Sequence, residues 1–264
     1  MALHTREGGL VLPNAWDGLS ALLLADAGFE AAATSSGALA ATLGRPDGRH
    51  EVSRDEHLEH ARLLGRLTGL PVNGDFEDGY GDTPEAVAVT VEAAVEHGLA
   101  GIGIEDTTGD PVRPIRGFDD AVDRVRAAVA AAKRRIVVTG RTDNFIQGRP
   151  DLDDTIRRLT AFAEVGADVV YAPFPPDLDA LGAIVTAVAP TPVNVLVSPA
   201  DKVLTVDELR QAGVKRISLG PFLYAGAMAA LERATKALAA GDLAAATAGM
   251  GFDRIGELIA GAKH

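Results

Sequence analysis

The chain of 264 residues contains no cysteine. This absence excludes disulfide bonds, a thiolate nucleophile and any zinc site built on cysteine ligands. It leaves the redox compartment undetermined, because a chain without thiols suits reducing and oxidising surroundings equally. Aromatic residues are also scarce, at 5%, and Trp16 is the only tryptophan.

Basic residues are outnumbered, since 25 Lys and Arg stand against 37 Asp and Glu and give a net charge of −12. A surface of this sign repels phosphate backbones and anionic lipids, so we expect neither a nucleic-acid nor a membrane partner. No apolar run is long enough to cross a bilayer, and the polar residues 1–7 lack the apolar core of a signal peptide. The sequence therefore predicts a cytoplasmic protein.

Several motifs of familiar chemistry are missing too. The chain has no GxxxxGK[ST] phosphate-binding loop and no GxSxG nucleophile elbow. A Schiff-base aldolase needs a buried lysine at a strand end, and none of the predicted strands supplies one. Lys202, which follows the seventh predicted strand, is interpreted as a solvated side chain rather than an anion ligand.

Apolar, strand-like runs alternate with helical stretches along the whole chain. The predicted strands are residues 10–14, 31–35, 71–75, 101–105, 135–141, 168–173, 192–197 and 216–219. Helix start signals lie between them: Ser53 with Glu56, and Thr205 with Glu208, both match the capping box.

Eight strands alternating with helices, without a linker or a change in composition, predict one (β/α)8 barrel, a TIM barrel, spanning residues 1–264. A doubly wound open sheet is the competing interpretation, but an open fold of this length usually leaves residues for a second domain, and none are evident. Residues 242–264 form a C-terminal helical extension beyond the barrel. We expect this alanine-rich extension to pack against another subunit.

Two predicted strands end in carboxylates. Asp75 and Glu77 follow the third strand, and Glu105 closes the fourth. Adjacent parallel strands lie about 4.8 Å apart, so these acids converge if the two strands are neighbours. Such an all-oxygen set suits Mg²⁺ or Mn²⁺ better than zinc. The alternative is that each acid caps the following helix. We favour the metal because both runs end in acid and turn residues follow both.

Other strand ends carry candidate binding residues. Arg141 ends the fifth strand, and because a lone buried arginine is costly, it should meet an anion, either a substrate carboxylate or a metal-site acid. Ser36 and Gly37 follow the second strand, where backbone N–H groups suit a carboxylate or phosphate, although a plain tight turn fits equally. Trp16 follows the first strand and is either a wall of the pocket or a packing residue.

Residues 43–52 are rich in charge and turn formers and predict a mobile loop beside the site. Asp47 in this loop either supports the metal from behind its ligands or is a solvated turn residue. His50 is either a general acid or an exposed side chain. His57 and His60, on the next predicted helix, are expected at the surface.

Five segments together carry a resemblance to a known family. They are residues 13–17 (PNAWD), 34–38 (TSSGA), 75–81 (DFEDGYG), 103–106 (GIED) and 140–143 (GRTD). Over about residues 10–238 the chain resembles the isocitrate lyase and phosphoenolpyruvate mutase superfamily. The third segment is the most specific, being close to that family's DxDxGYG with Glu77 in place of the second aspartate.

The resemblance implies a barrel whose last helix is exchanged between subunits in a homo-oligomer, a dimer or a dimer of dimers. It implies Mg²⁺ held through Asp75, Glu77 and Glu105, partly by way of water, and a pocket for a small carboxylate. The residues that it places around this substrate are Trp16, Ser36, Gly37, Asp47 and Arg141, with Arg141 and Asp47 in catalysis.

The chain departs from the family on the loop after the fourth strand. Isocitrate-type lyases carry Lys-Lys/Arg-Cys-Gly-His there, with the cysteine as acid or base, and phosphonopyruvate mutases carry Lys-x-Asn-Ser. Residues 107–114 instead read TTGDPVRP, and Pro173 stands where relatives place a glutamate or histidine. Neither activity can therefore be carried over directly.

The hypothesis that remains is a Mg²⁺-dependent lyase that cleaves a C–C or P–C bond in a small 2-oxo or 2-hydroxy carboxylate through a metal-stabilised enolate. Residues 107–117 and the loop around Asp47 are the expected lids. The candidate proton donors are Asp110, Arg113, Arg116 and His50. One alternative is a phosphonopyruvate hydrolase or a phosphonomutase-type transferase on the same scaffold. Another is a non-catalytic protein that binds metal and carboxylate.

Overall fold

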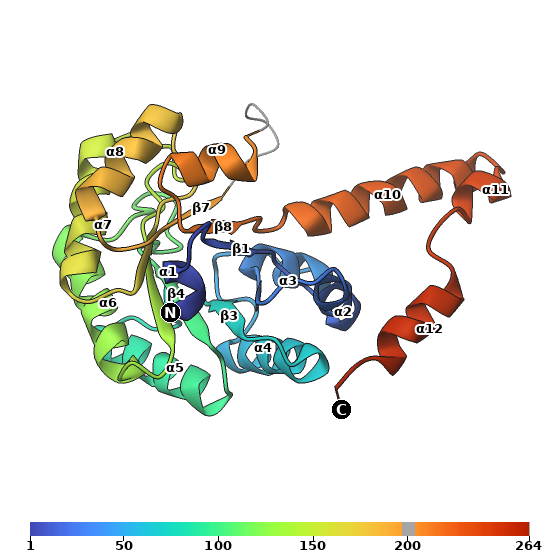
Figure 1. Ribbon diagram of the computed structural model, residues 1–264, viewed down its shortest axis with the longest axis horizontal. Coiled ribbons are helices and arrows are strands. Elements are labelled where there is room, and N and C mark those ends of the chain that lie inside the picture. The colour runs from blue at the N-terminus through green and yellow to red at the C-terminus, as the bar shows by residue number, and fades with distance from the viewer. Residues whose placement is uncertain (197–203, 264) are drawn as a thin grey trace.

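The computed structural model describes residues 1–196 and 204–263 and contains eight parallel strands (Figure 1). The strands are β1 (Leu10–Leu12), β2 (Ala32–Ala33), β3 (Val72–Asp75), β4 (Gly101–Glu105), β5 (Val137–Arg141), β6 (Val169–Tyr171), β7 (Val193–Leu196) and β8 (Arg216–Ser218). They pair in the order β1-β8-β7-β6-β5-β4-β3-β2, and a parallel bridge between Asn14 and Ala33 brings the two ends together. The predicted barrel is confirmed, and the open sheet is excluded.

Twelve helices lie within the described residues, and most connect one strand to the next. They are α1 (Ala2–Thr5), α2 (Gly18–Asp26), α3 (Ser36–Thr42), α4 (Arg54–Thr68), α5 (Pro84–Glu96), α6 (Phe118–Ala132), α7 (Leu152–Glu164), α8 (Leu178–Val188), α9 (Val206–Gln211), α10 (Phe222–Ala239), α11 (Leu243–Ala246) and α12 (Phe252–Ala260).

Local sequence signals explain where several helices begin. The capping boxes of Ser53 with Glu56 and of Thr205 with Glu208 start α4 and α9, as predicted. In each box the hydroxyl and the carboxylate satisfy backbone N–H groups that have no partner within the helix. Gly69 ends α4 with a φ of 70°, a left-handed conformation that costs glycine little.

The pairing register sets the depth of side chains inside the barrel. One row of paired residues crosses five strands, and its members are Glu105, Arg141, Tyr171, Asn194 and Arg216. Glu105 and Arg141 are the last residues of their strands, whereas Arg216 is the first of β8. With a strand tilt of about 36° and a spacing of about 4.8 Å, three steps along this row descend roughly 8 Å. Arg216 therefore starts well below Arg141.

The C-terminal part leaves the barrel as an arm (Figure 1). Helix α10 projects outward without a buried residue, α11 lies at its far end, and α12 returns beside α2, where Arg254 pairs with Asp26. Leu231 and Leu238 of α10 are each 55% exposed. The arm thus presents apolar side chains that this chain does not cover. No helix in residues 1–196 or 204–263 combines the length and apolar character of a membrane span.

Candidate active site

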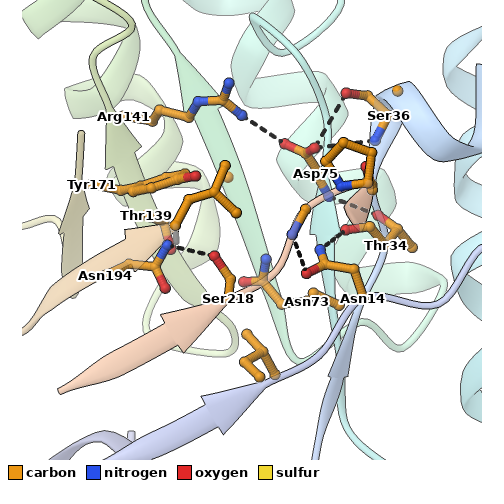
Figure 2. A pocket seen from close by; sticks show the side chains of 18 of the residues that line it. Asn14, Thr34, Ser36, Asn73, Asp75, Thr139, Arg141, Tyr171, Asn194 and Ser218 are labelled. Carbon is orange, nitrogen blue, oxygen red and sulfur yellow. Dashed lines mark hydrogen bonds and ion pairs between the residues drawn. The ribbon is translucent and has the colours of Figure 1, made fainter. Parts of the chain in front are cut away.

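A cavity of about 210 Å³ lies inside the barrel and opens where the strands end (Figure 2). Its upper part is formed by residues after β2, β3 and β5, and its deeper part by inward side chains of β3, β5, β7 and β8. The polar lining consists of Asn14, Thr34, Ser35, Ser36, Asp47, Asn73, Asp75, Thr139, Arg141, Tyr171, Asn194, Arg216 and Ser218. The carboxyl ends of the strands are the usual place for the active site of such a barrel.

Asp75 is held firmly at the end of β3. Its Oδ2 accepts hydrogen bonds from the backbone N and the Oγ of Ser36, at 3.1 and 3.2 Å. Its own backbone N donates to Thr34 Oγ1 at 2.9 Å, and its Oδ1 lies 3.3 Å from Arg141 Nη1 (Figure 2). Ser36, predicted as a substrate ligand, here orients the carboxylate.

Arg141 lies among three carboxylates. Its Nε and Nη2 donate to the two oxygens of Asp143 at 2.6 and 2.8 Å, and its Nη1 lies 3.0 Å from Glu105 Oε2 and 3.3 Å from Asp75. Burial acts to lower the pKa of Arg141, but Asp143, Glu105 and Asp75 hold it well above its usual range. The arginine therefore meets two of the predicted metal-site acids and one acid that the sequence reasoning overlooked.

The acids around Arg141 disfavour one another's charge. Burial, together with Asp47 and Asp75, raises the pKa of Glu77 to about 7. Burial also raises the pKa of Glu105 well above its usual range, with contributions from Asp143 and Asp75. Such mutual repulsion is relieved when a cation binds between the groups.

The oxygen-only donor set fits a hard divalent cation such as Mg²⁺. In the described ranges the carboxylates do not already converge as a ready cluster of three, because the Arg141 guanidinium lies between Asp75 and Glu105. Glu77 instead accepts hydrogen bonds from His50 N at 3.3 Å and from the Tyr80 hydroxyl at 3.4 Å. The chemistry of the predicted metal set fits, and its side chains lie in one region.

The remaining predicted residues fall in different places. Asp47 lines the cavity rim, and its Oδ2 lies 3.0 Å from the position that a Cβ on Gly37 would take, so glycine lets the loop approach α3. Partial burial and the charge of Asp75 raise the pKa of Asp47. Among the described residues Trp16 does not line this cavity; its ring packs edge-on against Tyr224, 5.6 Å between centroids.

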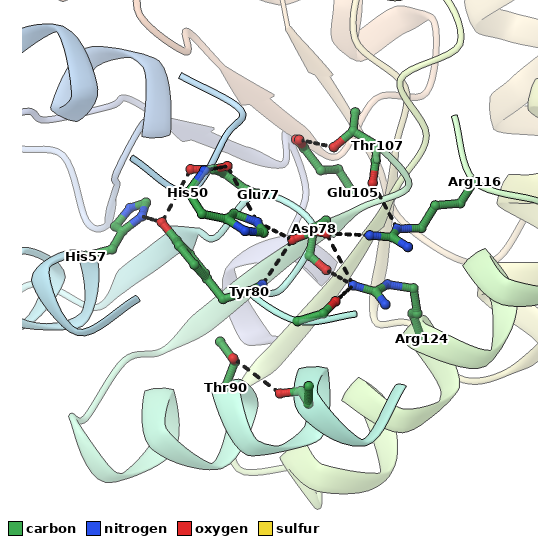
Figure 3. A network of polar contacts seen from close by, with 12 residues as sticks. His50, His57, Glu77, Asp78, Tyr80, Thr90, Glu105, Thr107, Arg116 and Arg124 are labelled. Carbon is green, nitrogen blue, oxygen red and sulfur yellow. Dashed lines mark hydrogen bonds and ion pairs between the residues drawn. The ribbon is translucent and has the colours of Figure 1, made fainter. Parts of the chain in front are cut away.

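A buried carboxylate ties two loops to the end of β3 (Figure 3). Asp78 Oδ1 lies 2.7 Å from His50 Nε2, and Asp78 Oδ2 accepts from Arg116 Nη2 at 2.6 Å and from Arg124 Nη2 at 3.4 Å. Burial alone would raise the pKa of Asp78, but the hydrogen bonds from His50 and Arg116 lower it. Residues 43–52 and 107–117, the two expected lids, therefore share one anchor.

The expectation that His57 and His60 lie at the surface was wrong. His57 is fully buried, with Nε2 3.1 Å from Thr34 Oγ1 and Nδ1 3.2 Å from the Tyr80 hydroxyl, and it stacks on Phe76. Burial lowers its pKa to about 4, so it is neutral at pH 7. His60 is half-buried and bonded to a backbone oxygen. His57 supports the turn that carries Asp75 and Glu77.

The candidate proton donors are spread over the same loops. Arg116 is bound to Asp78, whereas the side chains of Asp110 and Arg113 are 41% and 86% exposed on the loop after β4. Lys202 lies outside the described residues. The cavity residues that the sequence reasoning missed are Asp143, Tyr171, Asn194 and Arg216. The argument that a strand arginine should meet an anion applied to Arg216 as well as to Arg141, and it was the available signal.

The fold and the site define the class: a parallel (β/α)8 barrel with an acid-lined cavity at the carboxyl ends of its strands. The family model described as phosphoenolpyruvate phosphomutase matches residues 1–239. The chain belongs to this family, within the isocitrate lyase and phosphoenolpyruvate mutase superfamily.

Three relatives illustrate the range of the superfamily. A Burkholderia cenocepacia J2315 protein, provisionally described as a lyase/mutase, is 43% identical, with a TM-score of 0.92 over 98% of this chain and 93% of that one. The 2-methylisocitrate lyase of Escherichia coli K12 is 33% identical over 81% of this chain and 74% of its own length. Oxaloacetate acetylhydrolase in complex with the product oxalate is 28% identical, with a TM-score of 0.84 over 97% and 91%. These names support an enzyme of this superfamily.

Proposed function

We propose that the protein is a Mg²⁺-dependent lyase that cleaves a C–C or P–C bond in a small 2-oxo or 2-hydroxy carboxylate. The observation that carries this proposal is the placement of Arg141 beside Asp75 and Glu105 at the mouth of an enclosed cavity. One cation and several carboxylates in one place suit a substrate that is itself an anion and a metal chelator. The lyase names of the relatives support the same reaction class.

Asp75, Glu77 and Glu105 are the residues that would hold the divalent cation, with Mn²⁺ as the alternative ion. The cation would supply Lewis-acid stabilisation of the negative charge that develops as the bond breaks. Ser36 would keep Asp75 in its present orientation through two hydrogen bonds. Thr107 does the same for Glu105, to whose Oε1 its hydroxyl donates at 2.7 Å.

Arg141 would bind the substrate carboxylate through its guanidinium, which Asp143 already orients by a bidentate contact. Asp47 would complete the ring of acids at the rim and support Asp75 and Ser36. The loop after β4 is braced by an antiparallel bridge from Thr107 to Ile115 and, with residues 43–52, would exclude water from the reacting atoms.

Two alternatives have their own support. The family description favours a phosphonopyruvate hydrolase or phosphonomutase-type transferase on the same scaffold. The sequence TTGDPVRP after β4, without a cysteine, favours a protein that binds metal and carboxylate without turnover. Screening 2-oxo acids, 2-hydroxy acids and phosphonates with Mg²⁺ or Mn²⁺ for release of pyruvate or phosphate separates the two reactions. Tight oxalate binding without any turnover would favour the binding protein.

The metal set gives a direct test of the proposal. Asp75→Asn and Glu77→Gln should each lower metal-dependent kcat at least about 100-fold, because each removes a charge that would hold the cation. Glu85→Gln, at an exposed position on the first turn of α5, serves as the control and should retain activity. Normal turnover in Asp75→Asn or Glu77→Gln would refute the metal assignment.

We also propose that the arm of α10 is exchanged between subunits in a dimer or tetramer. The exposed apolar side chains of α10 and its projection from the barrel support this. The cytoplasmic location stays a prediction.

A further inference from the structure

The floor of the cavity contains a second arginine for which the proposed function has no role. Arg216 is 3% exposed, lines the cavity and forms no ion pair with any carboxylate of residues 1–196 or 204–263. Its Nε donates to Asn194 Oδ1 at 2.9 Å, and its Nη1 has no hydrogen-bond partner among them. A buried guanidinium without a counter-charge is costly, so such a residue normally meets an anion.

The surroundings of Arg216 fix its direction without neutralising it. The Asn194 amide accepts from Arg216 and donates to Ser218 Oγ at 2.9 Å, so both of its ends are engaged (Figure 2). His4 of α1 is also near, but burial and the charge of Arg216 lower its pKa to about 3, which leaves it neutral. Burial lowers the pKa of Arg216 to about 10, so it remains a cation at pH 7.

The same cavity reaches from this floor to the proposed metal site. Both Arg141 and Arg216 line it, and their strand register separates them by roughly 8 Å in depth. Thr139, between the two levels, has a buried hydroxyl without a partner among the described residues. At roughly 30 Å³ per water molecule, the cavity of about 210 Å³ holds the equivalent of about seven waters, which is room for a short linear diacid.

We propose that Arg216, positioned by Asn194, is an anion subsite for the distal carboxylate of a dicarboxylic substrate. This inference rests on the proposed function in one respect, namely that the 2-oxo acid end of the substrate lies at the upper level beside Arg141. The substrate class then narrows from small 2-oxo or 2-hydroxy carboxylates to dicarboxylates. The distal carboxylate would accept from the free Nη1 of Arg216 and from the Thr139 hydroxyl.

Calorimetric titration with matched acids in the presence of Mg²⁺ tests the subsite. The two pairs are 2-oxoglutarate with 2-oxopentanoate, and 2-oxoadipate with 2-oxohexanoate, which differ only in the distal carboxylate. Wild type should bind at least one diacid about tenfold or more tightly than its partner. In Arg216→Met this ratio should fall below about threefold. The matched control is Lys215→Met, an exposed neighbour that carries the same charge, and it should keep the wild-type ratio.

Stability and oxalate binding separate this subsite from a structural role and from the metal site. Removing an unpaired buried charge should leave the melting temperature of Arg216→Met unchanged or raised; Arg216→Gln is the second variant if the first does not fold. Oxalate, which is too short to reach the floor, should bind wild type and Arg216→Met alike. If oxalate fails to bind wild type while the diacid preference is present and depends on Arg216, the metal proposal falls and the subsite stands.

Three outcomes would overturn the subsite. The first is a wild type without preference for either diacid, including one that binds none of the acids. The second is a preference that survives Arg216→Met. The third concerns the source of the anion: if inorganic phosphate binds wild type as tightly as the diacids and loses this affinity in Arg216→Met, the floor accepts free anions rather than a substrate carboxylate.

Discussion

The orientation of Arg141 depends on a residue that does not touch it. Asp106 is 2% exposed, and its two oxygens accept from Asp143 N at 2.9 Å and from Thr142 Oγ1 at 2.7 Å. Arg158, itself 4% exposed, completes this arrangement with its Nη1 3.1 Å from Asp106 Oδ2. Asp106 thereby fixes the turn from which Asp143 grips Arg141, so the guanidinium is oriented before any substrate binds.

Removing the Asp106 carboxylate should destabilise the fold more than it changes any surface property. We expect Asp106→Ala to lower the free energy of unfolding by about 3–5 kcal/mol, because it leaves the buried Arg158 without a counter-charge. Urea denaturation measures this loss. Asp106→Asn, which keeps the size of the side chain and one acceptor, should cost less. A change below about 1 kcal/mol in the alanine variant would show that the pair is not a structural anchor.

At the scale of elements, the two loops over the cavity behave as one unit because Asp78 binds both. His50 comes from the loop before α4 and Arg116 from the loop after β4. The loops also meet directly, since a Cβ on Gly109 would lie 3.1 Å from Gly48 O. Opening one loop therefore disturbs the other, and access to the cavity should depend on both anchors.

The His50–Asp78 contact should make the stability of this unit depend on pH. The hydrogen bond to Asp78 raises the pKa of His50 above its ordinary 6.5, so the stabilisation is complete below pH 6.5 and is lost as pH rises through the folded-state pKa. The lowered pKa of Asp78 keeps the carboxylate charged throughout this range. The melting-temperature difference between wild type and His50→Gln should therefore be larger at pH 6 than at pH 8.5.

A second pair provides the control for this measurement. Arg45 and Glu56 pair at the surface, and hydrogen bonds from Ser53 and Arg45 lower the pKa of Glu56 to about 2. Because neither partner titrates between pH 6 and 8.5, the effect of Arg45→Gln should be the same at both pH values. A pH-independent effect of His50→Gln would contradict the assigned role of the histidine.

For the whole molecule, the arm decides the state of assembly. Helix α10 has 18 residues and is therefore about 27 Å long, and Leu231 and Leu238 are exposed along it. Exposed apolar surface of this kind usually marks an interface. Leu231→Glu combined with Leu238→Glu should convert the proposed oligomer into a smaller species.

Light scattering after size exclusion tests this expectation. Val89→Glu on α5, where the side chain is 52% exposed on the barrel itself, is the matched control and should retain the wild-type mass. A wild type that is monomeric at micromolar concentration would contradict helix exchange. So would an unchanged mass in the double variant.

The sequence allowed the barrel and most of its strand positions to be predicted because each depends on local periodicity. The fifth strand, for example, was expected at residues 135–141 and begins at Val137. The placement of Arg216 could not be predicted in the same way. Its depth relative to Arg141 follows from the pairing of four strands, and that register is set by the closure of the whole barrel.

The loop contacts were hidden for a similar reason. His50 and Asp78 are 28 positions apart, and Arg116 and Asp78 are 38 apart, so no local pattern links them. His57 was misplaced because one polar residue beside an apolar helical stripe is usually solvated. Its burial depends on the hydroxyl groups of Thr34 and Tyr80, which only the folded chain brings near it.

Asn14 joins the first and last parts of the barrel. Its amide donates to Thr34 O at 2.6 Å, and its oxygen accepts from the backbone N of Leu219 and Gly220 at 3.0 and 2.8 Å. Since 205 positions separate Asn14 from Leu219, a ribosome must release almost the entire barrel before this seam can form. Until then β1 lacks the β8 edge that completes it, and the nascent chain exposes a template for association with other unfinished chains.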